Sequence, residues 1–334
     1  MRYCLRAAWI FQAALWRDIM AKKYAFGVDV GGTTVKIGFF SLKGMLLGSW
    51  EIPTNKENGG ANILPEIAYS VKKHLEKAES GFDEVAGIGM GLPGPVLNDG
   101  TINKCINLGW GVFNVPAVMG DLCEGVYVKC GNDANVAALG EMHSGGGRGY
   151  KNVVMVTLGT GVGGGIVLDG RILNGAFGAA GEIGHIKVEK NEPDTCGCGK
   201  HGCLEQYASA SGIVRLAKKR LAADDAPTVL RDASSVSSKL IFDAAKAGDK
   251  VALELVETLG EYLGTALSYI SCVVDPEIFV IGGGVSKAGD ILIDVIKKYY
   301  RKNAFHASRN TAFALAELEN EAGMYGAAAL VLRN

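Results

Sequence analysis

Residues 24–40, YAFGVDVGGTTVKIGFF, carry the pattern from which the fold can be predicted. An apolar run ends at Asp29 and a glycine pair, and a second strand-like run follows, which predicts two strands joined by a tight turn over residues 29–34. The same pattern returns in VVMVTLGTGVGGGIVLDG, residues 153–170. The repetition indicates an internal duplication of one domain type, and it predicts two related halves that face a cleft.

Strands alternate with helices along the chain, which indicates the α/β class. Helices are expected at residues 204–221 and from Val251 to Asp275, where Pro276 must end the second one. The expected linker is SGGGRG, residues 144–149. The predicted domains are therefore a small one at residues 24–145, joined by the C-terminal helix 321–334, and a large one at residues 146–320.

Composition bounds the class of protein. The 334 residues are enough for about two domains, and 48% hydrophobic against 21% charged residues is the balance of a soluble globular protein. Lys and Arg total 34, Asp and Glu total 35, and no basic block occurs. We therefore expect a small-molecule ligand, with no nucleic-acid partner and no membrane partner.

Residues 1–23 are expected to be an N-terminal extension. They contain an apolar stretch from Ala7 to Trp16 behind two arginines, which is too short to span a bilayer and has no small-residue cleavage site after it. A short amphipathic helix packed on the domain is the alternative. Without an export signal, the eight cysteines indicate a reducing cytoplasm, and we expect a cytoplasmic protein.

Two glycine turns offer backbone N–H groups that suit phosphate. The first is Asp29–Thr34, and the second is Leu158–Gly161 on the equivalent turn of the repeat. A plain β-hairpin turn is the alternative for either one, but two such turns across a cleft can hold a triphosphate. Because neither GxxxxGK[ST] nor the HRD and DFG motifs occur, P-loop proteins and protein kinases are excluded.

Asp133 is the candidate catalyst. It lies in GNDANVAALGEM, residues 131–142, where a predicted strand passes into a predicted helix. The positive end of the helix dipole favours its ionised form, and an aspartate of low pKa can act as base in phosphoryl transfer. Asp is also a favoured helix cap, so a purely structural role is the alternative.

CGCGKHGCLE, residues 196–205, places Cys196, Cys198 and Cys203 in a C-x-C-x4-C spacing. These thiols are soft ligands for tetrahedral zinc, and the candidates for the fourth ligand are His185 and His201. A redox role is disfavoured because no C-x-x-C occurs here and an odd number of thiols cannot all pair. The pattern predicts a structural zinc site.

Several separate motifs resemble the ROK family of bacterial sugar kinases, and within that family the glucokinases. They are DVGGTTVKIG, GLPGP, GNDANVAALGE, LGTGVGGGI, and GAAGEIGH followed by CGCGKHGCLE, within residues 24–334. The resemblance implies a two-domain, actin-like ATPase fold of the hexokinase and ribonuclease H type, with a cleft between the domains. It implies ATP-dependent phosphorylation of the 6-hydroxyl of glucose, with Mg²⁺ and a structural Zn²⁺.

The resemblance also implies roles for single residues. Asp133 is the expected general base, and the expected sugar ligands are Asn107, Asn132, Asp133, Glu182, His185 and Glu205. The expected nucleotide site has Asp29 near Mg²⁺, Gly31, Gly32, Thr33, Gly159, Thr160 and Gly161 around the phosphates, and Gly283 near the adenosine. Lys36 neutralises phosphate charge or is a solvated strand lysine. For zinc the resemblance selects His185, with Cys196, Cys198 and Cys203.

Alternatives remain at this point. The sugar is glucose, or else N-acetylmannosamine, N-acetylglucosamine, mannose or fructose, and the donor is ATP, or else polyphosphate or ADP. Trp110 stacks on the sugar or packs its loop. The family also includes sugar-responsive repressors, but the residues before Tyr24 are too few for an ordinary DNA-binding domain. The resemblance suggests a homodimer or homotetramer.

Overall fold

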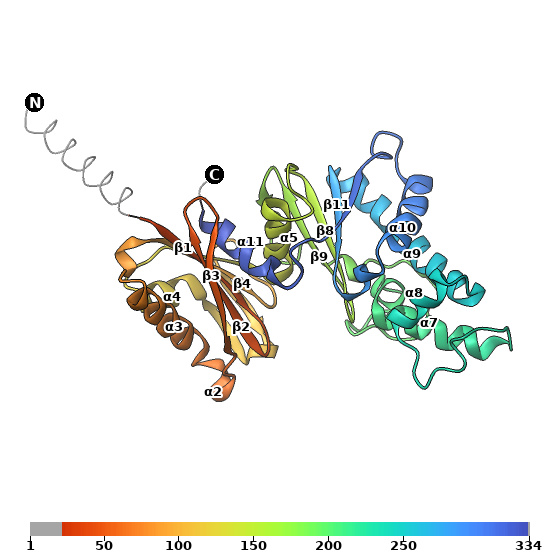
Figure 1. The fold of residues 1–334 in the computed structure, drawn as a ribbon, viewed down its shortest axis with the longest axis horizontal. Helices are drawn as coiled ribbons and strands as arrows, with labels where there is room; N and C mark the ends of the chain where they lie inside the picture. Colours follow the sequence, from red (N-terminus) through yellow and green to blue (C-terminus); the bar gives the residue numbers. More distant parts are fainter. Residues whose placement is uncertain (1–21, 333–334) are drawn as a thin grey trace, which may run out of the picture. The chain divides into compact units, whose positions relative to one another are not determined.

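The computed structural model describes residues 22–332, and the predicted N-terminal extension therefore lies almost wholly outside the described residues (Figure 1). The chain divides into two compact units. Within the described residues, the first unit runs to Gly140 and adds Asn174–Gly178 and the segment from Glu321 onward. The second unit comprises Glu141–Leu173 and Ala179–Asn320. The predicted domain limits at residues 145 and 146 stay a prediction.

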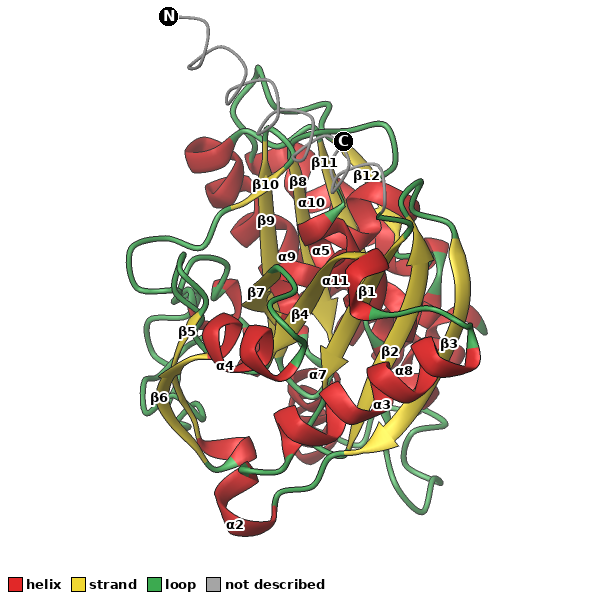
Figure 2. Ribbon diagram, turned by 90° about the vertical axis from the view of Figure 1, so that its left-hand side faces the viewer, coloured by secondary structure: helices red, strands yellow, loops and turns green. Residues whose placement is uncertain are grey.

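The first unit is built on a five-stranded sheet in the order β3-β2-β1-β4-β7. Helices α3 and α4 cover one face of this sheet, and α11 lies on the other face (Figures 1 and 2). A separate hairpin pairs β5 with β6. The strands are β1 (Tyr24–Val30), β2 (Thr34–Ser41), β3 (Leu46–Pro53), β4 (Val85–Leu92), β5 (Thr101–Cys105), β6 (Trp110–Asn114) and β7 (Val128–Asn132). The helical segments are α2 (Glu57–Gly60), α3 (Ile63–Lys77), η1 (Phe82–Glu84), η2 (Ile106–Leu108), α4 (Val115–Leu122), the start of α5 (Asp133–Ser144), and α11 (Ala322–Val331).

The second unit has its own five-stranded sheet, in the order β10-β9-β8-β11-β12. Its helices share one hydrophobic core with the apolar residues of β8, β9 and β11. The strands are β8 (Val153–Leu158), β9 (Val162–Leu168), β10 (Arg171–Ile172), β11 (Ile278–Gly282) and β12 (Ala312–Leu315). The helical segments are η3 (Ile183–His185), α6 (Glu205–Ala208), α7 (Ala210–Ala223), α8 (Ser238–Lys246), α9 (Lys250–Val274), η4 (Gly284–Ala288), α10 (Asp290–Asn303) and η5 (Glu319–Glu321).

The two sheets share one topology. In each sheet the first strand pairs antiparallel with the second, the second pairs antiparallel with the third, and the two later strands add in parallel beside the first. Each sheet therefore has a glycine turn between its first two strands, and the carboxyl ends of its parallel strands lie beside that turn. The predicted α/β class and the similarity between the two halves are confirmed.

Two sequence expectations differ from the structure. The helix expected over residues 204–221 is broken at Ser209, whose extended backbone separates α6 from α7 and whose side chain accepts a hydrogen bond from Gly212 N at 2.9 Å. Serine prefers such a capping position to a helix interior. The expected linker at residues 144–149 is instead a turn held by Glu141, which accepts from Gly146 N through Oε2 (2.9 Å) and from Gly147 N through its carbonyl (3.0 Å).

Glycine at position 89 is a requirement of packing between β4 and α11. A Cβ at Gly89 would lie 1.6 Å from the carbonyl oxygen of Ala327, whereas a Cβ at Gly48 on β3 meets no atom within 4 Å. We expect Gly89→Ala to lower the free energy of unfolding by about 3 kcal/mol, because the helix must move away from the sheet. Gly48→Ala is the matched control and should change it by less than about 0.5 kcal/mol. Urea unfolding of both variants tests this, and equal losses would contradict the packing argument.

Candidate functional site

Parallel pairing brings the candidate residues of the first unit to one edge of its sheet. Strands β1, β4 and β7 run in parallel, with Asp29 opposite Gly91 and Gly91 opposite Gly131. The segments that follow these positions are the first glycine turn, the GLPGP turn and Asn132–Asp133. In open α/β sheets, ligands bind outside the carboxyl ends of the strands, so this edge is the candidate site.

Asn132 and Asp133 make different contacts at the start of α5. The side-chain oxygen of Asn132 accepts from Asn135 N at 3.2 Å and from Ala134 N at 3.0 Å, so Asn132 caps the helix. Its Nδ2 donates to the carbonyl oxygen of Gly94 at 3.1 Å, which ties the GLPGP turn to the start of α5. Asp133 accepts from Ala134 N at 2.7 Å. The cap that bonds Asn135 N is therefore Asn132, which weakens the purely structural interpretation of Asp133.

Asp29 is a partly buried carboxyl at this edge with a raised pKa. Burial and the nearby Asp133 charge together raise its pKa to about 6, although Lys36 partly opposes the rise. Lys36 lies directly opposite Asp29 in the register of β1 and β2. On the other side, a Cβ on Gly323 would lie 2.5 Å from a carboxylate oxygen of Asp29, so α11 closes over it. Two carboxylates at one partly buried edge suit a cation such as Mg²⁺.

The first glycine turn is short and hydrogen-bonded. Gly31 N donates to the carbonyl oxygen of Thr34 at 3.0 Å, and Thr54 Oγ1 donates to that of Gly31 at 2.8 Å. Gly32 and Thr33 are exposed, and a Cβ on Gly32 would meet no atom within 4 Å. The turn therefore leaves its backbone open to a ligand, as phosphate binding requires.

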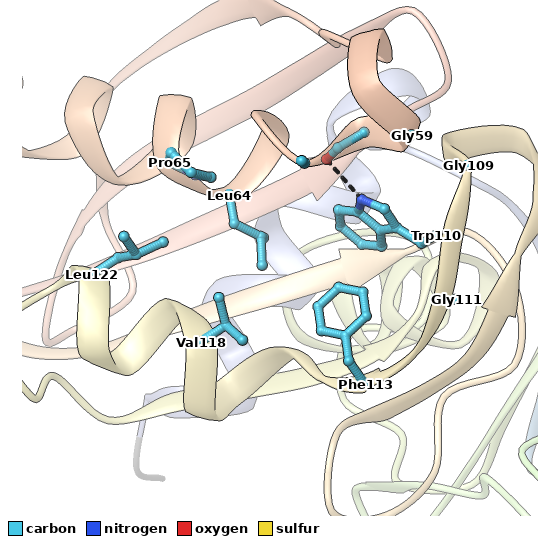
Figure 3. A pocket seen from close by; sticks show the side chains of 11 residues that line it. Gly59, Leu64, Pro65, Gly109, Trp110, Gly111, Phe113, Val118 and Leu122 are labelled. Atoms are coloured by element: carbon cyan, nitrogen blue, oxygen red, sulfur yellow. Dashed lines mark hydrogen bonds between the residues drawn. The ribbon is translucent and has the colours of Figure 1, made fainter.

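The structure resolves the role of Trp110 in favour of packing. Trp110 is 5% exposed, and its Nε1 donates to the carbonyl oxygen of Gly60 at 2.9 Å. With Phe113 it lines a cavity of about 340 Å³ beside Leu64 and α4 (Figure 3). Asn107 lies on the same connection between β5 and β6, in η2, and is exposed.

The second glycine turn lies beside a predicted sugar ligand in the second unit. A Cβ on Gly161 would lie 2.5 Å from Oε2 of Glu205. Gly283 has φ +84° and approaches the backbone of Leu158, which immediately precedes the turn, so that a Cβ there would lie 2.6 Å from the Leu158 oxygen. The positions predicted for phosphate, adenosine and sugar in this unit are therefore neighbours.

The cysteine segment and His185 form one cluster. His185 and the three cysteines offer ligand atoms that all lie within 4.8 Å of one another. Cys196 Sγ lies 3.8 Å from His185 Nδ1, and Cys198 Sγ lies 3.6 Å from Cys203 Sγ. A tetrahedral zinc with Zn–S bonds of about 2.3 Å requires ligand separations of roughly 3.7 Å, so the donor set fits zinc in both chemistry and spacing. His201 instead contacts the carbonyl oxygen of Asp194 at 3.1 Å through Nδ1.

Pairing of two short segments holds the cluster together. Lys187 bridges to Cys203, and Leu204 N donates to the carbonyl oxygen of Ile186 at 2.9 Å, so the chain after His185 runs beside the end of the cysteine segment. Glu205 Oε1 lies 2.7 Å from Cys196 Sγ and 3.7 Å from His185 Nδ1. Glu182 is exposed one residue before η3, and its carbonyl oxygen accepts from His185 N at 3.2 Å. The structure thus groups Glu182, His185 and Glu205 around the cluster.

Sequence reasoning missed the residues packed behind the cluster, which are Glu192, Gln206 and Arg215. Glu192 is 8% exposed, although it lies in the polar stretch KNEPDT. With Lys190 and Asp194 beside it, Glu192 has the pattern of a solvated loop residue. No spacing in the sequence relates it to Gln206 and Arg215, which lie on two separate helices, α6 and α7.

The sequence profile of the ROK family matches residues 25–334. The chain belongs to the ROK family. It is 42% identical to a glucokinase of Halalkalibacterium halodurans, over 93% of this chain and 96% of the relative. It is 31% identical to the N-acetylgalactosamine kinase AgaK of Shewanella sp., over 91% of this chain and 96% of that relative.

Solved structures agree with this assignment. The ROK-family glucokinase of Streptomyces griseus, solved with glucose and AMPPNP, has a TM-score of 0.69 and 34% identity over 92% of this chain and 99% of its own. The predicted ROK resemblance and the actin-like ATPase fold are therefore confirmed, and the His and Cys cluster is consistent with the zinc site of a ROK protein. None of the helices within residues 22–332 is both long and apolar enough to cross a membrane.

We expect Cys198→Ser to abolish stoichiometric zinc binding, because it removes one ligand of a tetrahedral site. The melting temperature should fall by about 2–4 °C for each kcal/mol of metal-linked stability that is lost. Cys272→Ser is the matched control, since Cys272 is an exposed thiol on α9 outside the cluster. Elemental analysis and melting curves with and without a chelator test this. Melting that is unchanged by zinc removal would contradict a structural role.

The raised pKa of Asp29 predicts a pH-dependent stability. The folded state binds the proton of this carboxyl more tightly than the unfolded chain, so burying the ionised form costs stability above pH 6, and the cost disappears as the pH falls toward 4. A shift of about two units corresponds to about 3 kcal/mol. Asp29→Asn should therefore raise the free energy of unfolding by up to about 3 kcal/mol at pH 8, with no gain at pH 4.

Urea unfolding at both pH values, without added magnesium or nucleotide, measures this difference. The control is Asp121→Asn, which alters an exposed aspartate on α4. A gain of the same size at both pH values would mean that charge burial is not its cause.

Proposed function

We propose that this ROK protein is a glucokinase, which transfers the γ-phosphoryl group of ATP to the 6-hydroxyl of glucose with Asp133 as general base. The observation that carries the proposal is the direct passage of β7 into α5, with Asn132 as cap, which leaves Asp133 at the edge occupied by Asp29. The 42% identity to a glucokinase over nearly the whole chain supports glucose as the sugar.

In the proposed reaction, the Asp133 carboxylate accepts the proton of the sugar hydroxyl as its oxygen attacks the γ-phosphorus. The bond from that phosphorus to the bridging oxygen breaks, and ADP leaves. The transition state is loose, so most of the proton transfer comes late and a base of low pKa suffices. The reaction also requires the sugar hydroxyl and the γ-phosphate to be aligned and water to be excluded from them.

The nucleotide is assigned to the two glycine turns. Gly31, Gly32 and Thr33 on the first turn, and Gly159, Thr160 and Gly161 on the second, would donate backbone N–H groups to the phosphates, with Gly283 near the adenosine. Lys36 would neutralise phosphate charge beside Asp29. Asp29 would hold Mg²⁺, which supplies charge neutralisation at the phosphates when bound.

Asn107, Asn132, Glu182, His185 and Glu205 are assigned to the sugar hydroxyls. Carboxylates accept hydrogen bonds from vicinal hydroxyls, and amides donate and accept. His185 directs Nδ1 toward the cysteines, so a zinc ion bound there would leave Nε2 as a proton donor to the sugar. Zinc–thiolate ligation suits a reducing compartment, so the proposal places the enzyme in the cytoplasm, as a homodimer or homotetramer.

Asp133→Asn should lower kcat for glucose by about 100- to 10,000-fold, because it removes the proton acceptor while it conserves shape. ADP release measured by a coupled assay gives kcat, and calorimetry of glucose binding shows whether the variant still folds and binds. Asp121→Asn serves as the control. Full activity of Asp133→Asn would show that another group is the base.

A panel of sugars and a DNA assay separate the alternatives. We expect glucose to give a higher kcat/KM than N-acetylmannosamine, N-acetylglucosamine, mannose or fructose. A higher value for one of these sugars would identify it as the substrate and leave the proposed reaction unchanged. ATP should also surpass polyphosphate and ADP as donor. A sugar-responsive regulator would instead bind DNA with a steep salt dependence and would release no ADP.

A further inference from the structure

A buried ion pair lies behind the cysteine cluster. The carboxylate of Glu192 is 3% exposed and is paired with Arg215 of α7, with Nη1 donating to Oε1 and Nη2 to Oε2, each at 2.9 Å. Tyr207 donates its hydroxyl to the same carboxylate, and Asp194 N donates to it at 3.0 Å. Burial alone would raise the pKa of Glu192, but the hydrogen bonds from Arg215 and Tyr207 outweigh it and hold the pKa at about 2. This carboxylate is therefore ionised and fully partnered.

Gln206 connects this pair to the metal ligands. Its Oε1 accepts from Gly202 N at 2.8 Å and from Cys203 N at 3.0 Å, and its Nε2 donates to the carbonyl oxygen of Asp194 at 2.9 Å. One side chain therefore joins the arm that precedes Cys196 to the arm that ends at Cys203. Arg215 also donates to the carbonyl oxygen of Gln206, at 2.9 Å through Nη2. The backbone that follows Glu205 is thus held by the same guanidinium that neutralises Glu192.

We propose that Glu192, Gln206 and Arg215, here called the brace, are positioning residues that hold Cys203 for the metal and Glu205 for the sugar. The brace fixes both arms of the cysteine segment through hydrogen bonds that do not involve the metal. Ordering ligands within the fold removes an ordering cost from the binding step, so it raises affinity. The part that concerns Glu205 rests on the proposed function, whereas the part that concerns Cys203 does not.

The chain offers a matched pair of arginines on α7 to test this. Arg215 belongs to the brace and pairs with Glu192, whereas Arg220 pairs with Asp224 and Glu254, each at 2.8 Å. We expect Arg215→Met to weaken zinc binding by about 10- to 100-fold, as removal of an outer-shell support does, and Arg220→Met to change it by less than about threefold. Competition with a chromogenic chelator measures the affinity for zinc itself.

Arg215→Met leaves the buried Glu192 with Lys219, whose Nζ lies 3.4 Å from Oε1, as its remaining cationic partner, and this loss alone can destabilise the fold. The double variant Glu192→Leu/Arg215→Met removes both charges, and circular dichroism and melting show that it folds. Gln206→Glu is a conservative probe, because its carboxylate still accepts from Gly202 N and Cys203 N but cannot donate to Asp194. Both should bind zinc more weakly than Arg220→Met does. Zinc affinities equal to that of Arg220→Met in folded variants would overturn the proposal.

Glucose binding by calorimetry, on zinc-loaded protein, tests the second half. The folded brace variants should bind glucose at least about threefold more weakly than Arg220→Met, because Glu205 is no longer held in position. If the brace only stabilised the fold, the melting temperature alone would change. Unchanged glucose affinity would overturn the positioning of Glu205. If the wild-type protein does not bind glucose, the proposed substrate fails, while the comparison of zinc affinities still decides the positioning of Cys203.

Discussion

Parallel pairing of β1 with β4, and of β4 with β7, is the constraint on which the candidate site depends. Asp29, Gly91 and Gly131 share one row of the sheet, and the chain leaves that row by three different turns. One of these turns leads directly into α5 and Asp133. A change of register by one residue in any of these strands would turn the side chains to the other face and separate the two carboxylates.

Holding two acidic groups at a partly buried edge has an energetic cost. Burial and the nearby Asp133 both raise the pKa of Asp29, and Lys36 on the neighbouring strand offsets only part of the effect. A partly buried carboxylate of this kind is stabilised when a cation binds beside it. Carboxyl groups with perturbed pKa values are therefore common at functional sites. The proposed Mg²⁺ fits this charge distribution, because it brings the positive charge that Lys36 supplies only in part.

The second unit repeats the topology of the first and uses it differently. Its glycine turn also joins the first two strands of a sheet, but the insertion that follows β10 folds back as the cysteine cluster and brings Glu205 beside Gly161. The brace supports this cluster through hydrogen bonds to Cys203 N and to the carbonyl oxygen of Asp194. A buried ion pair adds little net stability on average, so its value here lies in fixing the geometry of neighbouring groups.

Much of this protein was determined by its sequence alone. The repeated strand, glycine turn and strand predicted two related sheets, and the C-x-C-x4-C spacing predicted a zinc site, because local patterns determine local structure. The resemblance to the ROK family selected His185 over His201 as the fourth ligand. The break at Ser209 and the cap made by Asn132 are local, because each side chain accepts from a backbone N–H three residues on, but the sequence does not show which of several suitable residues caps. The burial of Trp110 depends on a neighbour distant in the chain, Gly60. So does the brace, since Glu192 reads as a loop residue until α7 places Arg215 against it. Only tertiary packing decides which polar groups lose their water, and the pKa of Asp29 and the partners of Glu192 both follow from that loss.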